Sequence, residues 1–198
     1  MTRRFGRAFY ARPATEVARE LLGQVLVGYE RDGTRLAARV VETEAYLPDD
    51  EASHSFRGPT DRNRVMFGRA GLLYVYFTYG MHHCMNAVTG PEGEGSAVLL
   101  RAAEPIEGMT TMAGRRGSDG IRNLCSGPAK LCQAFGVDRT LDGVDLVTSN
   151  RLSVERGAPV GERDVATTTR VGVSSGIEHQ RRFVVVGDPF VSTGRPAS

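Results

Sequence analysis

Residues 24–46 read QVLVGYERDGTRLAARVVETEAY, and this stretch decides the fold. Its Asp32-Gly33 pair separates two apolar runs, and such a pair between hydrophobic runs is a strong signal for a β-hairpin. The second run contains β-branched residues such as Val40 and Val41, which favour strands. The stretch therefore predicts two antiparallel strands joined by a tight turn.

The second of these strands carries two carboxylates. Residues two apart on a strand share a face, so Glu42, Glu44 and Tyr46 would project together. Their backbone positions would be roughly 6.5–7 Å apart, and inverting glycoside hydrolases separate acid and base by about 6.5–9.5 Å. The spacing permits hydrolysis at C1 of a sugar. It equally suits a solvated strand face whose carboxylates pair with arginine.

The rest of the chain alternates between helical and strand-like patterns, without an internal repeat or a linker. We expect helices within residues 11–24, 106–124 and 129–135, and mostly loop over residues 47–71. We expect strands on both sides of a turn at 78–80 and within residues 96–105, 145–157, 170–173 and 181–190. This alternation predicts one mixed α+β domain over residues 1–198, with mobile ends at about 1–8 and 192–198.

Length and composition fit a globular protein. The chain has 198 residues, of which 40% are hydrophobic and 24% are charged, as is ordinary for soluble domains. No apolar run approaches the ~20 residues needed to span a bilayer, and the stretch MTRRFGRAFYARP lacks the apolar core of a signal peptide. We therefore expect a cytoplasmic protein without a membrane partner.

The cysteines and histidines do not form a metal-binding pattern. Cys84, Cys125 and Cys132 are an odd number without a CxxC pair, which argues against both a disulfide framework and a zinc ribbon. His82 and His83, next to Cys84, would point to opposite faces of a strand and could not chelate together. We expect no metal and no other cofactor.

A second hairpin, with the sequence LLYVYFTYGMHHCMNAV, is rich in aromatic residues. Alternation places Tyr74 and Tyr76 on one face and aliphatic residues on the other. Tyr79 lies at the turn, where it either packs beside its own hairpin or forms a wedge that enters a base stack. In the second case Tyr76, Tyr46 and His54 could stack around a base.

The sequence LCSGPAKLCQ begins a helix that is a candidate phosphate site. Ser126 before Gly127-Pro128 resembles an N-cap followed by a proline in the first turn, and Gly136 would end the helix. Free N–H groups at such a start attract phosphate, and Lys130 lies nearby. Many helices begin in this way without binding anything, so the pattern alone leaves both alternatives open.

The basic residues are almost all arginines. The formal net charge is +2, which indicates a localised basic face rather than a general attraction to nucleic acid. Clusters such as Arg57, Arg62 and Arg64 suit bidentate contacts with phosphate. Codon usage in a GC-rich genome would also produce an arginine bias, so the bias as a whole does not identify a function.

Taken together, these motifs resemble those of the alkyladenine (3-methyladenine or methylpurine) DNA glycosylase family. The resemblance is carried, in order, by ETEAY, HSFRGPT, VMF, LYVYFTYG, AVLLRAAEP and LCSGPAKLCQ, and it covers about residues 9–190. HSFRGPT is more similar to bacterial members. The resemblance implies a curved antiparallel sheet with flanking helices, and a β-hairpin that protrudes into the minor groove of DNA.

The resemblance assigns the chemistry to three residues. Glu44 matches the general base that activates the water attacking C1′ of the nucleotide. Arg101 matches the arginine that helps to hold that water or the nearby phosphate, and Val171 matches the residue whose carbonyl also positions it. Glu42 is then a structural residue that is paired or capping.

Base recognition and the roles of Tyr79 and Met66 are assigned in the same way, whereas the other expected DNA contacts come from the arginine cluster and the helix start. The residues implied around the flipped base are Tyr46, His54 and Tyr76, with Asn86 disfavouring the amino group of guanine. The residues expected to contact DNA are Tyr79, inserted into the gap, Met66 beside it, and Arg57, Arg64, Ser126, Gly127 and Lys130. Asp61 stands where family members often have proline, and its charge would soften contacts with the DNA backbone.

The expected activity is excision of alkylated purines from double-stranded DNA, above all 3-methyladenine, with hypoxanthine and ethenoadenine as further candidates. A cationic alkylated purine is a good leaving group, so one ionised glutamate suffices. A lyase needs an amine to form a Schiff base, and the sole lysine, Lys130, lies in the helix-start motif. We therefore expect a monofunctional, monomeric enzyme, associated with the nucleoid through DNA, that leaves an abasic site.

Two alternatives stay open at this point. One is a hydrolase of nucleosides or small glycosides that uses Glu42 and Glu44 as acid and base. The other is a non-catalytic protein that binds damaged DNA through the same aromatic hairpin.

Overall fold

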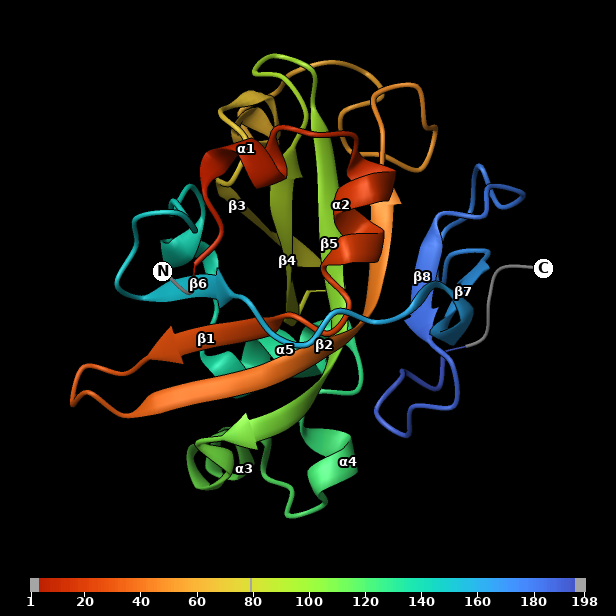
Figure 1. The fold of residues 1–198 in the computed structure, drawn as a ribbon. Coiled ribbons are helices and arrows are strands. Elements are labelled where there is room, and N and C mark those ends of the chain that lie inside the picture. Colours follow the sequence, from red (N-terminus) through yellow and green to blue (C-terminus); the bar gives the residue numbers. More distant parts are fainter. Residues whose placement is uncertain (1–3, 79, 195–198) are drawn as a thin grey trace.

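A curled antiparallel sheet organises the fold (Figure 1). The computed structural model describes residues 4–78 and 80–194, so the prediction for Tyr79 lies outside the described residues. In this part of the chain, strands pair in the order β3-β4-β5-β2-β1-β6, and β8 pairs with both β2 and β7. Every pair is antiparallel. These features confirm the predicted α+β fold with a curved antiparallel sheet.

The described residues form strands, α-helices and short 3-10 helices, joined by connections of unequal length. The strands are β1 (Val25–Tyr29), β2 (Arg35–Tyr46), β3 (Leu73–Thr78), β4 (His82–Thr89), β5 (Ser96–Glu107), β6 (Leu152–Glu155), β7 (Val165–Thr168) and β8 (Arg182–Val185). The α-helices are α1 (Arg7–Tyr10), α2 (Ala14–Glu20), α3 (Met109–Arg116), α4 (Ile121–Leu124) and α5 (Pro128–Phe135). Short 3-10 helices are η1 (Arg64–Phe67), η2 (Arg139–Leu141) and η3 (Glu162–Asp164).

Strand β2 changes neighbours halfway along its length. Residues 35–39 pair with β1, as the Asp-Gly turn predicts, whereas residues 42–44 pair with β8. The register of β2 against β5 shifts on both sides of Glu42. Such bulges bend a strand and redirect side chains. In Figure 1, β2 accordingly turns from its outer arm beside β1 to run between β5 and β8.

Two helices pack on the sheet near the strands that carry the acidic residues. α2 packs on β2 and β5, and α5 packs on β4 and β5. Val17 of α2 and Leu131 of α5 belong to one buried apolar cluster. Thr43 Oγ1 also donates a hydrogen bond to the carbonyl of Ala18 at 2.8 Å. This bond ties α2 to the middle of β2.

The β3–β4 hairpin lies at the edge of the sheet, and side chains hold its outer strand. The N–H of Val75 donates to Asp142 Oδ1 at 2.8 Å, and the carbonyl of Val75 accepts from Arg139 Nη1 at 2.5 Å. Nearer the turn, the carbonyl of Phe77 accepts from Arg62 Nη2 at 3.2 Å. These contacts satisfy backbone groups that an edge strand otherwise leaves unpaired, so the hairpin is braced along its outer side.

Several predicted boundaries are wrong. The helix predicted over residues 11–24 is α2, which ends at Glu20. The chain then turns at Gly23, whose φ is 80° and whose N–H donates to the carbonyl of Val40 at 2.8 Å. Residues 106–124 hold the end of β5 and two helices, α3 and α4, instead of one helix and a loop.

The strand predicted at residues 170–173 is also wrong. The strand in this region is β7, which ends at Thr168. Residues 170–173 form no strand, since Gly172 has a φ of 74°, which lies outside the β region. In the segment 145–157, only β6 is a strand.

The mobility of the chain ends stays a prediction, and the structure describes residues 4–8 and 192–194 of them. The N–H of Phe5 donates to the carbonyl of Val154 at 3.3 Å, and Phe5 is buried. At the other end, the N–H of Ser192 donates to Glu42 Oε2 at 2.8 Å. These contacts hold Phe5 and Ser192 against the sheet.

Candidate active site

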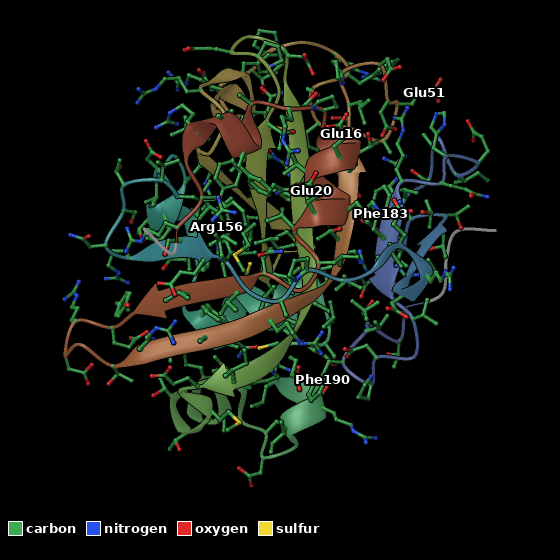
Figure 2. The ribbon with its side chains drawn as sticks, viewed as in Figure 1. Glu16, Glu20, Glu51, Arg156, Phe183 and Phe190 are labelled. Atoms are coloured by element: carbon green, nitrogen blue, oxygen red, sulfur yellow. The ribbon has the colours of Figure 1, made fainter. Side chains whose placement is uncertain are left out.

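A pocket of about 440 Å³ lies where β2, the β3–β4 hairpin and β5 meet the loop after β7. Pockets of this size are typical of sites that bind small organic groups. Its walls combine aromatic, polar and backbone groups: Tyr46, Glu51, Ala52, His54, Met66, Tyr74, Tyr76, Thr78, Cys84, Asn86, Leu99, Arg101, Pro128, Val171, Gly172, Val173, Ser174 and Ser175. Figure 2 shows Glu51 on the loop beyond the end of β2. The aromatic share of the walls suits a flat, unsaturated ligand.

Glu44 lies beneath this pocket with a fully buried side chain. Its Oε2 accepts hydrogen bonds from the Tyr46 hydroxyl at 2.9 Å and from Arg101 Nη1 at 3.3 Å. Its Oε1 accepts from the N–H of Val171 at 2.8 Å. Three donors of this kind stabilise a negative charge. Because Tyr46, Arg101 and Val171 all line the pocket, the carboxylate and the pocket share these three residues.

Glu42 does not line the pocket, and both of its carboxylate oxygens accept hydrogen bonds. Arg101 Nε donates to its Oε1 at 2.8 Å, and Arg182 Nε donates to the same oxygen at 2.7 Å. The Ser192 hydroxyl donates to Oε1 at 2.9 Å. Burial alone would raise the pKa of Glu42, but the charges of Arg101 and Arg182 outweigh it and lower that pKa. The prediction that Glu42 is paired is confirmed.

The four charges form a balanced group behind the pocket. Glu42 and Glu44 contribute two negative charges, and Arg101 and Arg182 contribute two positive charges. Arg101 joins the two carboxylates and is itself buried. This arrangement disfavours the alternative in which Glu42 acts as a partner acid or base, because its oxygens are occupied by Arg101, Arg182 and Ser192.

Tyr74 and Tyr76, which were predicted to share a face, lie together in the aromatic wall of the pocket, and His54 packs beside them. The ring centroids of His54 and Tyr76 are 4.5 Å apart, and those of Tyr74 and Tyr76 are 5.7 Å apart. The Tyr46 ring forms the neighbouring part of the wall. The interpretation of the hairpin as one aromatic and one aliphatic face is confirmed, since Leu73 and Val75 lie in the apolar core.

The His54 ring lines the pocket between the tyrosines and has a hydrogen-bond partner at one of its nitrogens. Its Nδ1 lies 2.9 Å from the Tyr74 hydroxyl. Burial of the ring against the tyrosines, and then the charge of Arg62, lower the pKa of His54, so its imidazole is neutral at pH 7. Burial raises the pKa of Tyr74 to about 12, which keeps its hydroxyl protonated. A neutral ring suits stacking with a base without adding charge to the pocket.

Asn86 was predicted to line the pocket and does so, and its Nδ2 donates to the carbonyl of Tyr74 at 3.2 Å. Other residues of the pocket wall were not predicted from the sequence. Cys84 and Leu99 also line the pocket, and the alternation that selected Tyr76 could have selected Cys84, its cross-strand partner. Ser174 and Ser175 carried no signal in the sequence, because the loop that holds them has no periodic pattern.

The residues predicted to contact DNA fall into two groups, one on and before η1 and the other at the start of α5. Met66 is buried in its wall, and Arg57 lines an adjoining recess of about 240 Å³. Arg64 is exposed on η1 and pairs with Asp61 at 3.5 Å. In this group only Met66 lies in the pocket itself, while the two arginines lie outside it.

The second group is the start of α5. The prediction that Ser126 is the N-cap is wrong: Gly127 holds that position without a side-chain bond, and Pro128 begins the helix. Gly127 has a φ of 156°, and Pro128 lines the pocket. Lys130 Nζ donates to Asn123 Oδ1 and, at 3.4 Å, to Ser126 Oγ. Burial and the charge of Arg116 lower the pKa of Lys130.

Metal clusters and membrane-spanning helices are both absent from the described residues. Among residues 4–78 and 80–194, no group of three or more histidine, cysteine, aspartate or glutamate residues is placed to hold a metal ion. In the same part of the chain, no helix is both long and apolar enough to cross a membrane.

The chain is similar in sequence to a known protein family and to several of its members. The family model described as methylpurine-DNA glycosylase matches residues 8–189. The chain is 47% identical to a protein of Carboxydothermus hydrogenoformans named "Putative 3-methyladenine DNA glycosylase", over 94% of this chain and 97% of that protein. A protein of the same name from Streptomyces avermitilis is 50% identical over 96% of this chain and 91% of its own length. The DNA-3-methyladenine glycosylase of Homo sapiens is 47% identical over 96% of this chain and 68% of its own length.

Proposed function

This chain belongs to the methylpurine-DNA glycosylase family, and on that premise we propose that it is a monofunctional glycosylase that flips damaged purines out of duplex DNA and hydrolyses their bond to C1′. The observation that carries the proposal is the buried Glu44 carboxylate beneath an aromatic pocket. The pocket offers stacking surfaces for a base. In the proposed complex, the sugar of a base held in the pocket lies next to this carboxylate.

In the proposed reaction, water adds to C1′ as the bond between C1′ and the purine nitrogen breaks. Glu44 takes a proton from that water, and the bonding electron pair leaves with the purine. Positive charge builds up at C1′, so an ionised carboxylate also stabilises the transition state. Arg101 and the backbone of Val171 hold the carboxylate and the attacking water. A purine that is already cationic needs little help from an acid.

Recognition of the base falls to the aromatic wall. Tyr46, Tyr76 and His54 stack around the flipped purine, and a ring of electron-rich faces favours a cationic base. Asn86 is oriented by its bond to the Tyr74 carbonyl, and we assign to it the exclusion of guanine through its amino group. Hypoxanthine and ethenoadenine are further proposed substrates, since each is a flat purine derivative.

We assign the contacts with the DNA backbone to residues near the pocket and to the start of α5. The start of α5, with Ser126, Gly127 and Lys130, offers N–H groups and a cation to phosphate. Arg57 and Arg64 contact the backbone from the other side, and Met66 supports the insertion of Tyr79. Double-stranded DNA that contains a damaged purine is the proposed partner, with the enzyme acting as a monomer.

The test of this function is base release. We expect the wild-type protein to release 3-methyladenine from a methylated duplex, and we would measure release from inosine-containing and ethenoadenine-containing duplexes in parallel. Methylated nucleosides free in solution should not be cleaved, because a free nucleoside makes none of the contacts with the DNA backbone. Cleavage of the free nucleosides at the rate of the duplex would instead favour a nucleoside hydrolase. Tight binding without release from any duplex would favour a non-catalytic binder.

A further expectation concerns the absence of lyase activity. Lys130 is the sole lysine of the chain, and its Nζ is engaged with Asn123 and Ser126 at the start of α5. A Schiff base with the sugar requires a free amine at C1′. Borohydride added during turnover should therefore trap no covalent protein–DNA adduct, as judged by denaturing gel electrophoresis. Any trapped adduct would contradict the monofunctional assignment, and its disappearance in Lys130→Arg would identify the amine.

A further inference from the structure

Arg170 is the largest of the fully buried side chains among the described residues, yet it is not part of the pocket wall. Its guanidinium binds both carboxylate oxygens of Asp50, with 2.9 Å between Nη2 and Oδ1. Asp50 is also fully buried, and Arg181 Nη1 lies 3.0 Å from its Oδ2. A buried arginine of this kind keeps a fixed orientation because its planar fork matches the carboxylate.

The fixed guanidinium lies against the ring of Tyr46. The Arg170 Cζ atom is 4.8 Å from the ring centroid, within the range of a cation–π contact. Tyr46 lines the pocket and Arg170 does not. Arg170 therefore supports one side of the Tyr46 ring, while Tyr46 also presents a surface to the pocket. The position of this ring sets where a stacked base can lie.

Arg170 also contacts the loop that forms another part of the pocket wall. Its Nη2 donates to the carbonyl of Gly176 at 3.2 Å, and its Nη1 donates to the carbonyl of Ala45 at 3.4 Å. The segment 171–175 between Arg170 and Gly176 lines the pocket, beginning with Val171, which holds Glu44. A single side chain thus connects the end of β2, the loop with Asp50 and the loop after β7.

We propose that Arg170, held by Asp50, is a positioning residue that acts on the reaction through the ring of Tyr46 and the wall formed by residues 171–175. This proposal rests on the proposed glycosylase function. It predicts that removing Arg170 misplaces the base relative to Glu44 without removing any group that touches the base. Misplacements of about 1 Å can cost a reaction about 10²-fold.

The experiment must separate positioning from stability, because an unpaired Asp50 would destabilise the fold. The informative variant is the double substitution Asp50→Asn/Arg170→Met, which removes both charges together. Asparagine keeps the side-chain oxygen that accepts from the N–H of Ala52 at 3.1 Å in the wild type. The matched control is Arg7→Met/Asp145→Asn, which removes another arginine–aspartate pair, 2.5 Å apart, from residues outside the pocket wall.

The measurement is single-turnover release of 3-methyladenine from a methylated duplex, at a temperature where both double variants are folded by circular dichroism. We expect the maximal rate constant of Asp50→Asn/Arg170→Met to fall about 10- to 100-fold. The enzyme concentration at half-saturation should change less, and the control should stay within about threefold of the wild type. In a Tyr46→Leu background, the same double substitution should cost at least threefold less, because the part of its effect that acts through that ring is already lost, while the part that acts through residues 171–175 remains.

Three results would overturn the role of Arg170. These are an unchanged maximal rate constant in the folded Asp50→Asn/Arg170→Met protein, an equal loss in the control, or a full additive loss in the Tyr46→Leu background. Absence of base release by the wild type is a different result, because it would remove the proposed function itself.

Discussion

Replacing Glu44 by glutamine should reduce base release from a methylated duplex to the background level. The general base alone contributes about 10²–10⁴-fold to such reactions, and the loss of its negative charge also removes stabilisation at C1′. Glutamine keeps the shape of the side chain, so DNA binding should persist. Single-turnover release of 3-methyladenine and binding to the same duplex would be measured with one protein preparation.

Glu16→Gln is the matched control for Glu44→Gln. Glu16 lies on α2 with a largely exposed side chain (Figure 2), and it lies outside the pocket wall. Its loss should leave both release and binding unchanged. Turnover by Glu44→Gln at the wild-type rate would refute the assignment of the base. Loss of DNA binding together with turnover would instead point to a folding defect.

Replacing Glu42 by alanine should destabilise the fold by about 3–5 kcal/mol, the usual cost of leaving buried charges without their partner. Arg101 and Arg182 would each lose a hydrogen-bonded carboxylate, and Ser192 would lose both of its bonds to Glu42. Urea denaturation at pH 7 would measure the change. Glu20→Ala is the control, because the pair of Glu20 with Arg12 is exposed and such pairs contribute at most about 1 kcal/mol.

The same carboxylate should make stability depend on pH. The pKa of Glu42 is lowered in the folded chain, since Arg101 and Arg182 outweigh burial. Its contribution is therefore complete above the ordinary glutamate pKa of about 4.3 and is lost as the pH falls through the lower, folded value. Between pH 5 and pH 2 the unfolding free energy of the wild type should fall more steeply than that of Glu42→Gln. Parallel curves would contradict this role.

Local patterns predicted the parts of the fold that depend on near neighbours. The Asp-Gly turn predicted the β1–β2 hairpin, and alternation predicted that Glu44 and Tyr46 share a face, where they are hydrogen-bonded at 2.9 Å. Alternation also separated Tyr74 and Tyr76 from the aliphatic face of the second hairpin. These features follow from the two-residue period of a strand, which a sequence displays directly.

Contacts between distant segments were not visible in the sequence. Asp50 and Arg170 are 120 positions apart, and Glu42 and Ser192 are 150 positions apart. Nothing in the local pattern of residues 170–173 distinguishes a strand from a loop whose arginine turns inward. The resemblance to a family supplied the roles of Glu44 and Arg101. It did not supply Arg182 and Ser192, which hold Glu42 and lie outside the quoted motifs.

The change of neighbours along β2 has a consequence for the order in which this protein matures during synthesis. The segment that joins β2 at Glu42, with Arg182 and Ser192, is translated after Glu44 and the aromatic residues of the pocket. A nascent chain that ends before Arg182 already contains Glu44 and the aromatic residues of the pocket, but its Glu42 can meet only Arg101. Activity should therefore appear only after Arg182 and Ser192 have emerged from the ribosome and the four charges are balanced.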